Sequence, residues 1–109
     1  MTYEALVEKV REGMKNVQVS KTLGHVAFQF NVEGEGEGAF YVEVSGGKIN
    51  VEPYEYYDRD LIIVTTADVI VQMLEGELAP MAALTNQQLK AYGDVRQLEV
   101  LPFGGKSRK

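Results

Sequence analysis

The chain has no cysteine and a single histidine among its 109 residues. The absence of cysteine excludes a disulfide framework, thiolate catalysis and cysteine-ligated zinc. It also fits a reducing cytoplasm. A single histidine leaves little material for a histidine-based metal or catalytic centre.

Long apolar runs are also missing. A membrane-spanning helix needs about 20 consecutive apolar residues, whereas the run Leu61–Val64 is long enough only for a strand. The first residues, Thr2, Tyr3 and Glu4, lack the basic-then-apolar order of a signal peptide. We therefore expect a cytoplasmic protein.

Positive charge is scarce: 11 Lys and Arg stand against 16 Asp and Glu, which gives a net charge of −5. Because nucleic-acid backbones are bound by clustered cations, no nucleic-acid partner is expected. The exception is the basic end Lys106–Lys109. We interpret residues 104–109 as a flexible basic tail after a single domain, 1–103; transient contact with an anionic membrane is the alternative.

The first half of the chain changes its apolar period once. Apolar residues three and four positions apart predict a helix over 3–17, with Thr2 as its cap. From residue 26 onward, alternation predicts strands at 26–32, 40–44 and 49–51. Gly34–Gly38 and the pair Gly46-Gly47 would join them into an antiparallel meander with one covered face.

The second half mixes strands and short helices. A more fully apolar strand at 61–64 precedes a helix over 65–74, with Thr65 and Asp68 at its start and Gly76 after its end. Pro80 begins a short helix over 80–84. A last strand at 89–92 precedes a helix over 95–101, capped by Asp94 with Gln97 and ended by Pro102.

From Leu74 onward the order of residues is distinctive. The run Leu74–Leu84 contains a leucine-x-glycine-x-leucine-x-proline stretch, and Leu89, Lys90, Gly93 and Asp94 follow it. Together with Thr65, Thr66 and Asp68 upstream, and with Phe28, Phe30 and Phe40–Val44 in the early hairpin, the chain resembles the sterol carrier protein-2 (sterol-binding domain) family over residues 3–101.

The resemblance implies an α+β fold: a five-stranded, mixed but mainly antiparallel sheet with helices on one face. In lipid-binding relatives an apolar tunnel lies between these layers. The chain departs from the family at Tyr41, where many relatives have tryptophan, and at Asn86-Gln87, where a glycine is usual. Asparagine tolerates a left-handed turn, so the turn should survive.

No set of residues predicts catalysis. His25 at a strand entrance is interpreted as a surface or hydrogen-bonding residue. Asp58 and Asp60 flank Arg59, which favours a solvated loop over a calcium site. The glycine-rich stretch Gly34–Gly38 joins two antiparallel strands and contains glutamates, so it is a hairpin tip and no phosphate loop. We therefore expect no enzyme, no metal and no cofactor.

Three tyrosines, Tyr54, Tyr56 and Tyr57, form the densest aromatic cluster. Tyrosines in a loop usually lay their rings on the domain and leave the hydroxyl in water. The functional alternative is a portal or a contact surface for an apolar ligand or a partner.

Our hypothesis is a non-catalytic carrier for a lipid-like ligand: a fatty acyl chain, phospholipid, sterol or isoprenoid. The residues expected to line its tunnel share an apolar side chain on a predicted strand or helix; they are Phe28, Phe30, Phe40, Val42, Ile49, Val51, Ile63, Met73, Leu74, Met81, Leu84, Leu89, Leu98 and Leu101. The alternative is an accessory or assembly protein for a lipid-related enzyme, with a filled core and a protein-binding surface. A homodimer or another protein partner stays open.

Overall fold

The computed structural model describes residues 1–104, apart from the side chain of Leu23. Of the predicted tail, residues 104–109, only Gly104 is described, and residues 105–109 lie outside the described residues. The strands are β1 (His25–Glu33), β2 (Gly38–Ser45), β3 (Lys48–Glu52), β4 (Leu61–Thr66) and β5 (Lys90–Gly93). The helices are α1 (Tyr3–Met14), α2 (Ala67–Leu74) and α3 (Pro80–Thr85), with 3₁₀ helices η1 (Lys21–Leu23) and η2 (Val95–Val100).

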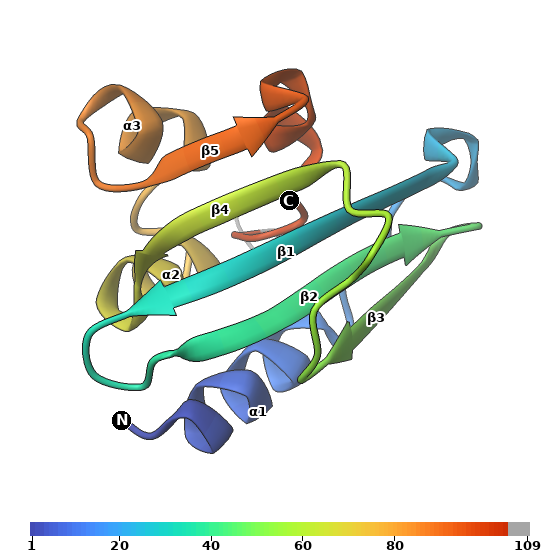
Figure 1. Ribbon diagram of the computed structural model, residues 1–109. Coiled ribbons are helices and arrows are strands. Elements are labelled where there is room, and N and C mark those ends of the chain that lie inside the picture. Colours follow the sequence, from blue (N-terminus) through green and yellow to red (C-terminus); the bar gives the residue numbers. More distant parts are fainter. Residues whose placement is uncertain (105–109) are drawn as a thin grey trace.

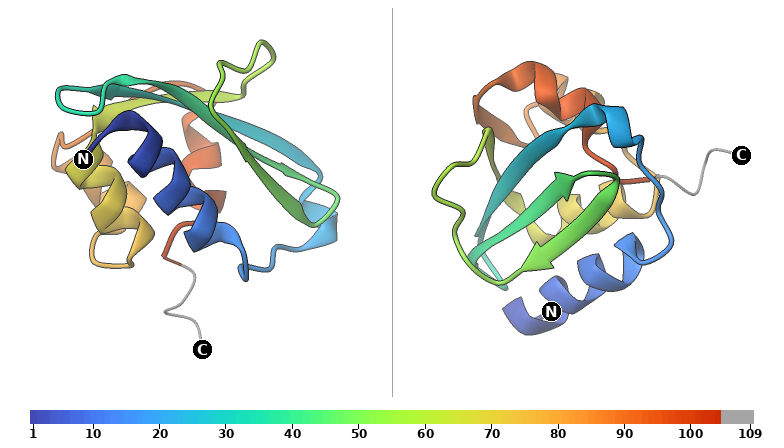
Figure 2. Two further views of the ribbon diagram at one scale, coloured as in Figure 1. Left: turned by 90° about the horizontal axis from the view of Figure 1, so that it is seen from below. Right: turned by 90° about the vertical axis from the view of Figure 1, so that its right-hand side faces the viewer.

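The five strands form one sheet in the order β3-β2-β1-β4-β5. The pair β1–β4 is parallel, while β1–β2, β2–β3 and β4–β5 are antiparallel. The helices α1, α2 and α3 all lie on one face of this sheet (Figures 1 and 2). The predicted fold class, a mixed and mainly antiparallel sheet with helices on one face, is confirmed.

The core lies between the sheet and the helices because the alternating side chains of the strands point there. Phe28, Phe30, Phe40 and Val42 have no exposed surface, and the stripe Leu6–Val10 of α1 covers them. Val42 pairs with Phe28 across β1 and β2, and Phe40 pairs with Phe30. One contiguous cluster therefore joins the layers.

The turns form largely as predicted. Thr2 caps α1 through its hydroxyl, which accepts a hydrogen bond from the Ala5 amide at 3.1 Å. Gly46 and Gly47 both have positive φ, 60° and 85°, as a tight two-residue hairpin requires. In the turn after α3 the left-handed residue is Gln87, with φ 63°, and not Asn86.

The end of α1 and the cap of α2 differ from the prediction. α1 ends at Met14, and Val17 follows in a turn. The cap of α2 is Thr66, because Thr65 still belongs to β4, faces the core and donates its hydroxyl hydrogen bond to the Gln88 carbonyl at 2.7 Å.

The last predicted helix is the 3₁₀ helix η2, and the side chain of Asp94 does not cap its backbone. Its six residues suit the tighter form, which occurs in short pieces. Gln97 donates a hydrogen bond to the Asp94 carboxylate at 3.3 Å, so the predicted pair does meet, side chain to side chain. Leu89 precedes β5 instead of beginning it, and it is buried.

The outer face of the sheet is covered in part, which the sequence did not predict. Residues 53–60 cross this face between β3 and β4, on the side away from the helices (Figures 1 and 2). Ala27 and Gln29 point outward from β1 yet are buried beneath the loop. The sheet face that the sequence predicted to be solvent-exposed is therefore partly covered by this loop.

Candidate functional site

A cleft opens where the C-terminal ends of α1 and α2 meet the last described residue of the chain. Its volume is about 740 Å³, within the range of about 300–1,000 Å³ typical of small-molecule sites. The residues around it come from three segments distant in sequence; they are Lys9, Glu12, Gly13, Met14, Asn16, Val17, Gln18, Leu74, Glu75 and Gly104.

The floor of this cleft is apolar because α1 and α2 approach closely at Gly13. A Cβ atom on Gly13 would lie 2.8 Å from Leu74 Cδ1, so only glycine leaves room for that side chain as it stands. Met14 and Leu74 are buried, and Val17 is half-buried against the core. An apolar ligand would meet these three side chains first.

The rim of the cleft is charged. Lys9 Nζ lies 3.5 Å from Glu75 Oε2 and bridges the two helices, while Lys15 Nζ lies 3.1 Å from Glu12 Oε2 along α1. All four side chains are partly exposed, and such pairs contribute at most about 1 kcal/mol each. They can therefore rearrange around a polar head group at little cost.

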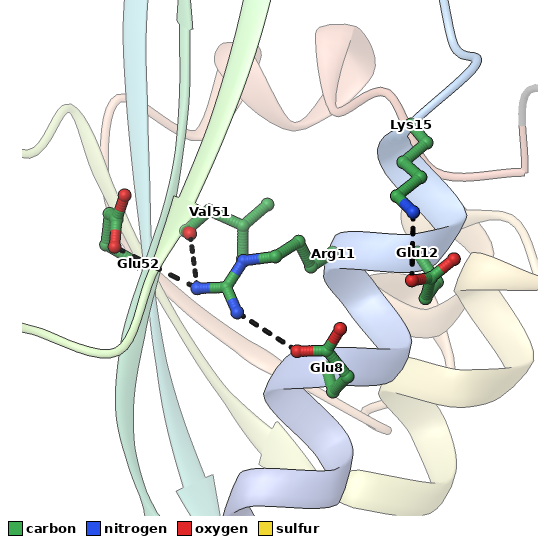
Figure 3. A network of polar contacts seen from close by, with 6 residues as sticks. All are labelled: Glu8, Arg11, Glu12, Lys15, Val51 and Glu52. Carbon is green, nitrogen blue, oxygen red and sulfur yellow. Dashed lines mark hydrogen bonds and ion pairs between the residues drawn. The ribbon is translucent and has the colours of Figure 1, made fainter.

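A second hollow of about 460 Å³ lies on the other side of α1, against β3. Arg11 crosses from α1 to this edge strand, donating one hydrogen bond to the Val51 carbonyl at 2.9 Å and another to Glu8 Oε1 at 3.1 Å (Figure 3). Its guanidinium also lies 3.9 Å from Glu52. Met14 and Val17 line both hollows, so they separate the two.

The core contains a row of stacked rings. Phe30 stacks on two rings. The centroid of its ring lies 5.0 Å from that of Phe40 and 5.5 Å from that of Phe103. Phe30 and Phe40 have no exposed surface, whereas Phe103 is 7% exposed. Phe103 therefore closes the core from the C-terminal segment, next to cleft residue Gly104.

The residues predicted to line a tunnel lie in different environments. Leu74 lines the cleft, and Ile49 and Val51 line the second hollow. Met81 is 39% exposed on α3 and does not face the core, because the short helix presents Ala83 inward instead. Leu84 is half-buried, and the others are buried in the sheet–helix core: Phe28, Phe30, Phe40, Val42, Ile63, Met73, Leu89, Leu98 and Leu101.

Sequence reasoning did not assign Met14, Val17 or Phe103 to the site. Met14 and Val17 belonged to the predicted stripe of the first helix, but nothing in that stripe indicated which end of it would be open. Phe103 lies just beyond the predicted last helix, at the domain boundary. The one indication in the sequence was a large apolar ring between Pro102 and Gly104.

The tyrosine cluster lies on the outer face of the sheet. Tyr56 donates its backbone N–H to Gln29 Oε1 at 3.1 Å and its hydroxyl to Glu43 Oε2 at 2.9 Å. The ring of Tyr56 meets that of Tyr41 edge-on at 4.8 Å. The loop lies on the face opposite the helices. Tyr56 lays its ring on the domain, as expected of a loop tyrosine, whereas Tyr54 and Tyr57 are exposed.

Hydrogen bonding and burial set the acidity of this cluster. The hydrogen bond to Glu43, followed by burial, raises the pKa of Tyr56, and burial followed by the charges of Glu52 and Glu43 raises the pKa of Tyr41. His25 Nε2 lies 2.7 Å from Glu43 Oε2 and 3.1 Å from the Tyr56 hydroxyl, as expected for a hydrogen-bonding surface residue.

Asp60 is less solvated than predicted. Its carboxylate accepts a hydrogen bond from the Ala27 amide at 2.8 Å, which fixes the end of the loop to β1. Among residues 1–104, no group of three or more His, Cys, Asp or Glu side chains could hold a metal ion. No helix in that part of the chain is long and apolar enough to cross a membrane.

Known structures share this fold at low sequence identity. UbiJ-SCP2, a ubiquinone synthesis protein, is 15% identical with a TM-score of 0.65, over 89% of this chain and 86% of that one. Sterol carrier protein-2 like-3 from Aedes aegypti is 13% identical with a TM-score of 0.65, over 91% and 92%. These likenesses show the fold alone.

The fold also occurs inside a larger enzyme. The sec-alkylsulfatase Pisa1 from Pseudomonas sp. is 13% identical with a TM-score of 0.59, over 72% of this chain but only 13% of that one. No curated protein matches the chain in sequence. Residues 5–101 match the SCP-2 sterol transfer family, which is most of the 109-residue chain. The chain therefore belongs to the SCP-2 sterol transfer family, a family of lipid-binding domains.

Proposed function

We propose that this domain is a non-catalytic carrier that takes up a lipid-like ligand through the cleft between α1 and α2. The observation that carries the proposal is the apolar floor formed by Met14, Val17 and Leu74, beside Gly104 and its buried neighbour Phe103. Membership of a lipid-binding family supports it. The ligand class is a fatty acyl chain, phospholipid, sterol or isoprenoid.

Uptake requires the helical layer to part from the sheet. The apolar part of the ligand enters over Leu74 and Met14 and displaces the ring of Phe103 from Phe30. It then lies among Met73, Leu98 and Leu101, side chains that fill the same layer when the ligand is absent. In this proposal the predicted tunnel opens only when the ligand is bound.

The magnitudes suit a carrier. Moving a chain of ~14 methylenes out of water gains ~11 kcal/mol, at ~0.8 kcal/mol for each. Several of these kcal/mol are lost to immobilisation and to the rearranged core. Transfer from a membrane is nearly neutral, because the chain already lies among hydrocarbon. The domain therefore exchanges lipid with a membrane and does not trap it.

A tryptophan reporter tests the entrance. The chain has no tryptophan, so Phe103→Trp places a single one next to the cleft residue Gly104. Addition of oleate or cholesterol should change the emission of this residue with saturable binding. Emission that stays constant while the protein binds oleate by an independent assay would place the ligand elsewhere.

Two matched substitutions test the apolar floor of the cleft. Val17→Asp places a carboxylate at a half-buried position of this floor and should weaken oleate binding at least about tenfold. Met81→Asp makes the same chemical change at an exposed methionine on α3 and should leave the affinity unchanged. Equal effects, with both variants folded by circular dichroism, would contradict the proposed entrance.

The second candidate function is an accessory protein for an enzyme that acts on a lipid-like molecule. The similarity to UbiJ-SCP2, a ubiquinone synthesis protein, supports it, as do the packed core and the aromatic residues exposed on the outer face. Mass spectrometry of extracts from the purified protein separates the candidates. A stoichiometric lipid favours the carrier, whereas an empty protein that takes up neither oleate nor cholesterol favours the accessory role.

A further inference from the structure

The loop of residues 53–60 is a built feature of the outer face. It leaves the edge strand β3, crosses the face opposite the helices and enters β4 (Figures 1 and 2). Viewed from below, it rises away from the sheet as a projection (Figure 2). Loops positioned by a rigid scaffold commonly carry the residues that bind ligands and partners.

Tyr56 anchors the middle of the loop. Its amide and hydroxyl bond Gln29 and Glu43, its ring meets Tyr41 edge-on with an interplanar angle of 90°, and Gln29 is only 3% exposed beneath it. Gln29 in turn donates to Asn31 Oδ1 at 2.9 Å. Tyr56 is thus hydrogen-bonded to two strands of the sheet, β1 through Gln29 and β2 through Glu43.

The end of the loop is held as firmly. Asp60 makes two hydrogen bonds to Ala27, one through its carboxylate at 2.8 Å and one through its amide at 2.9 Å. Arg59 folds back to the Tyr56 carbonyl at 3.3 Å. The backbone between these points is therefore preorganised, which lowers the entropy lost on binding a partner.

The side chains displayed by this anchored backbone are aromatic and exposed. Tyr57 is 92% exposed and Tyr54 is 63% exposed, on either side of the anchor. Tyrosine on a rigid loop offers a large amphipathic contact area at small entropic cost, and it is enriched at interface hot spots. The fold exposes these two rings, whereas Gln29 beneath the loop is buried.

The charge of the loop selects the partner. Glu55 and Asp58 are exposed beside the two tyrosines, and the exposed Arg59 is the loop's only cation. Such a surface repels an anionic membrane. It suits arginine side chains, which stack on tyrosine rings and pair with carboxylates.

We propose that Tyr54, Glu55, Tyr57 and Asp58 form a docking surface for a protein partner that presents arginine. This surface lies on the sheet face opposite the lipid cleft, and its role as a docking surface does not depend on lipid binding. It provides the partner site that the second candidate function requires. The lipid ligand and the partner can then be held at the same time on the two faces of the sheet.

The test uses hexa-arginine as the probe and the full-length ¹⁵N-labelled protein. Titration should shift the amide signals of residues 53–60 selectively. Tyr54→Ala/Tyr57→Ala and, separately, Glu55→Gln/Asp58→Asn should weaken binding at least about tenfold. The matched control Glu33→Gln/Glu37→Gln removes the same charge from two exposed positions, the end of β1 and the connection to β2, and should leave the affinity unchanged.

Three results would overturn the proposal. They are equal weakening by the control pair, binding of hexalysine as tight as that of hexa-arginine, and binding of phosphatidylglycerol vesicles through residues 53–60. Oleate binding by the two loop variants should equal that of wild type. A wild-type protein that binds hexa-arginine through residues 53–60 but does not bind oleate would count against the lipid cleft and leave the docking surface standing.

Discussion

Phe103 stacks on Phe30 with ring centroids 5.5 Å apart and ring planes 9° from parallel. Phe30 comes from the central strand β1, whereas Phe103 follows the last helical segment of the chain. Since Phe30 also stacks on Phe40, a residue near the C-terminus completes the row of rings on which the helices rest. The segment after η2 is thus part of the core, and it borders the proposed entrance.

Phe103→Ala should lower the free energy of unfolding by about 3 kcal/mol, because it removes a buried ring and leaves a cavity beside Phe30. If an acyl chain takes the place of this ring, saturating oleate should restore more stability to the variant than it adds to wild type. Urea unfolding with and without oleate measures both. Phe103→Leu is the control, and it should lose less stability and gain less from oleate.

Gly93→Ala should cost about 2–4 kcal/mol. Gly93 has a φ of 117°, and a Cβ atom there would lie 2.5 Å from the Asp60 carbonyl oxygen, a backbone atom that cannot move aside cheaply. The comparison is Gly24→Ala, where φ is 80° but nothing lies within 4 Å. That variant keeps only the backbone strain and should lose about 1–2 kcal/mol. Equal losses in thermal or urea unfolding would show that the contact with Asp60 is unimportant.

Alkaline pH should destabilise the anchor of the outer loop. The pKa of Tyr56 is raised above its ordinary value of 10.0, first by the hydrogen bond to Glu43. A raised pKa in the folded state stabilises the fold fully below the unfolded pKa, and this contribution is lost as pH rises through the folded one. The loss should therefore begin near pH 10 and continue above it.

Absorbance titration of tyrosinate, together with urea unfolding at each pH, measures this loss. Glu43→Gln should bring the pKa of Tyr56 down toward its ordinary value and flatten the alkaline loss of stability. Glu55→Gln removes an exposed carboxylate of the same loop that does not contact Tyr56, and it should leave the titration as in wild type. A titration unchanged by Glu43→Gln would contradict the role of that hydrogen bond.

Adjacent threonines should respond differently to mutation. Thr66→Ala removes the cap of α2, whose hydroxyl accepts from the Val69 amide at 3.4 Å, and should cost about 1 kcal/mol. Thr65→Val removes the buried hydrogen bond to the Gln88 carbonyl and should cost about 1–3 kcal/mol. Thr66→Ser, which keeps the capping oxygen, should be nearly neutral in the same urea experiment.

Much of the fold could be predicted because its signals are local. Alternation in β1 and β2 and the stripe of α1 placed the same residues in the core that the structure buries. Boundaries were less certain where two local signals compete. Thr65 and Thr66 are both good caps, and only the pairing of β4 with β1, which extends to Thr66, decides which one serves.

The amino-acid sequence by itself determined the order of elements, the face of each strand that is buried and the family, since these depend on neighbours along the chain. Only the tertiary structure decided that Met81 is exposed, that Phe103 closes the core and that the cleft lies over Gly13 and Leu74. It also decided that Tyr56 anchors a loop on the outer face. Each of these depends on residues far apart in sequence, whose meeting no local period encodes.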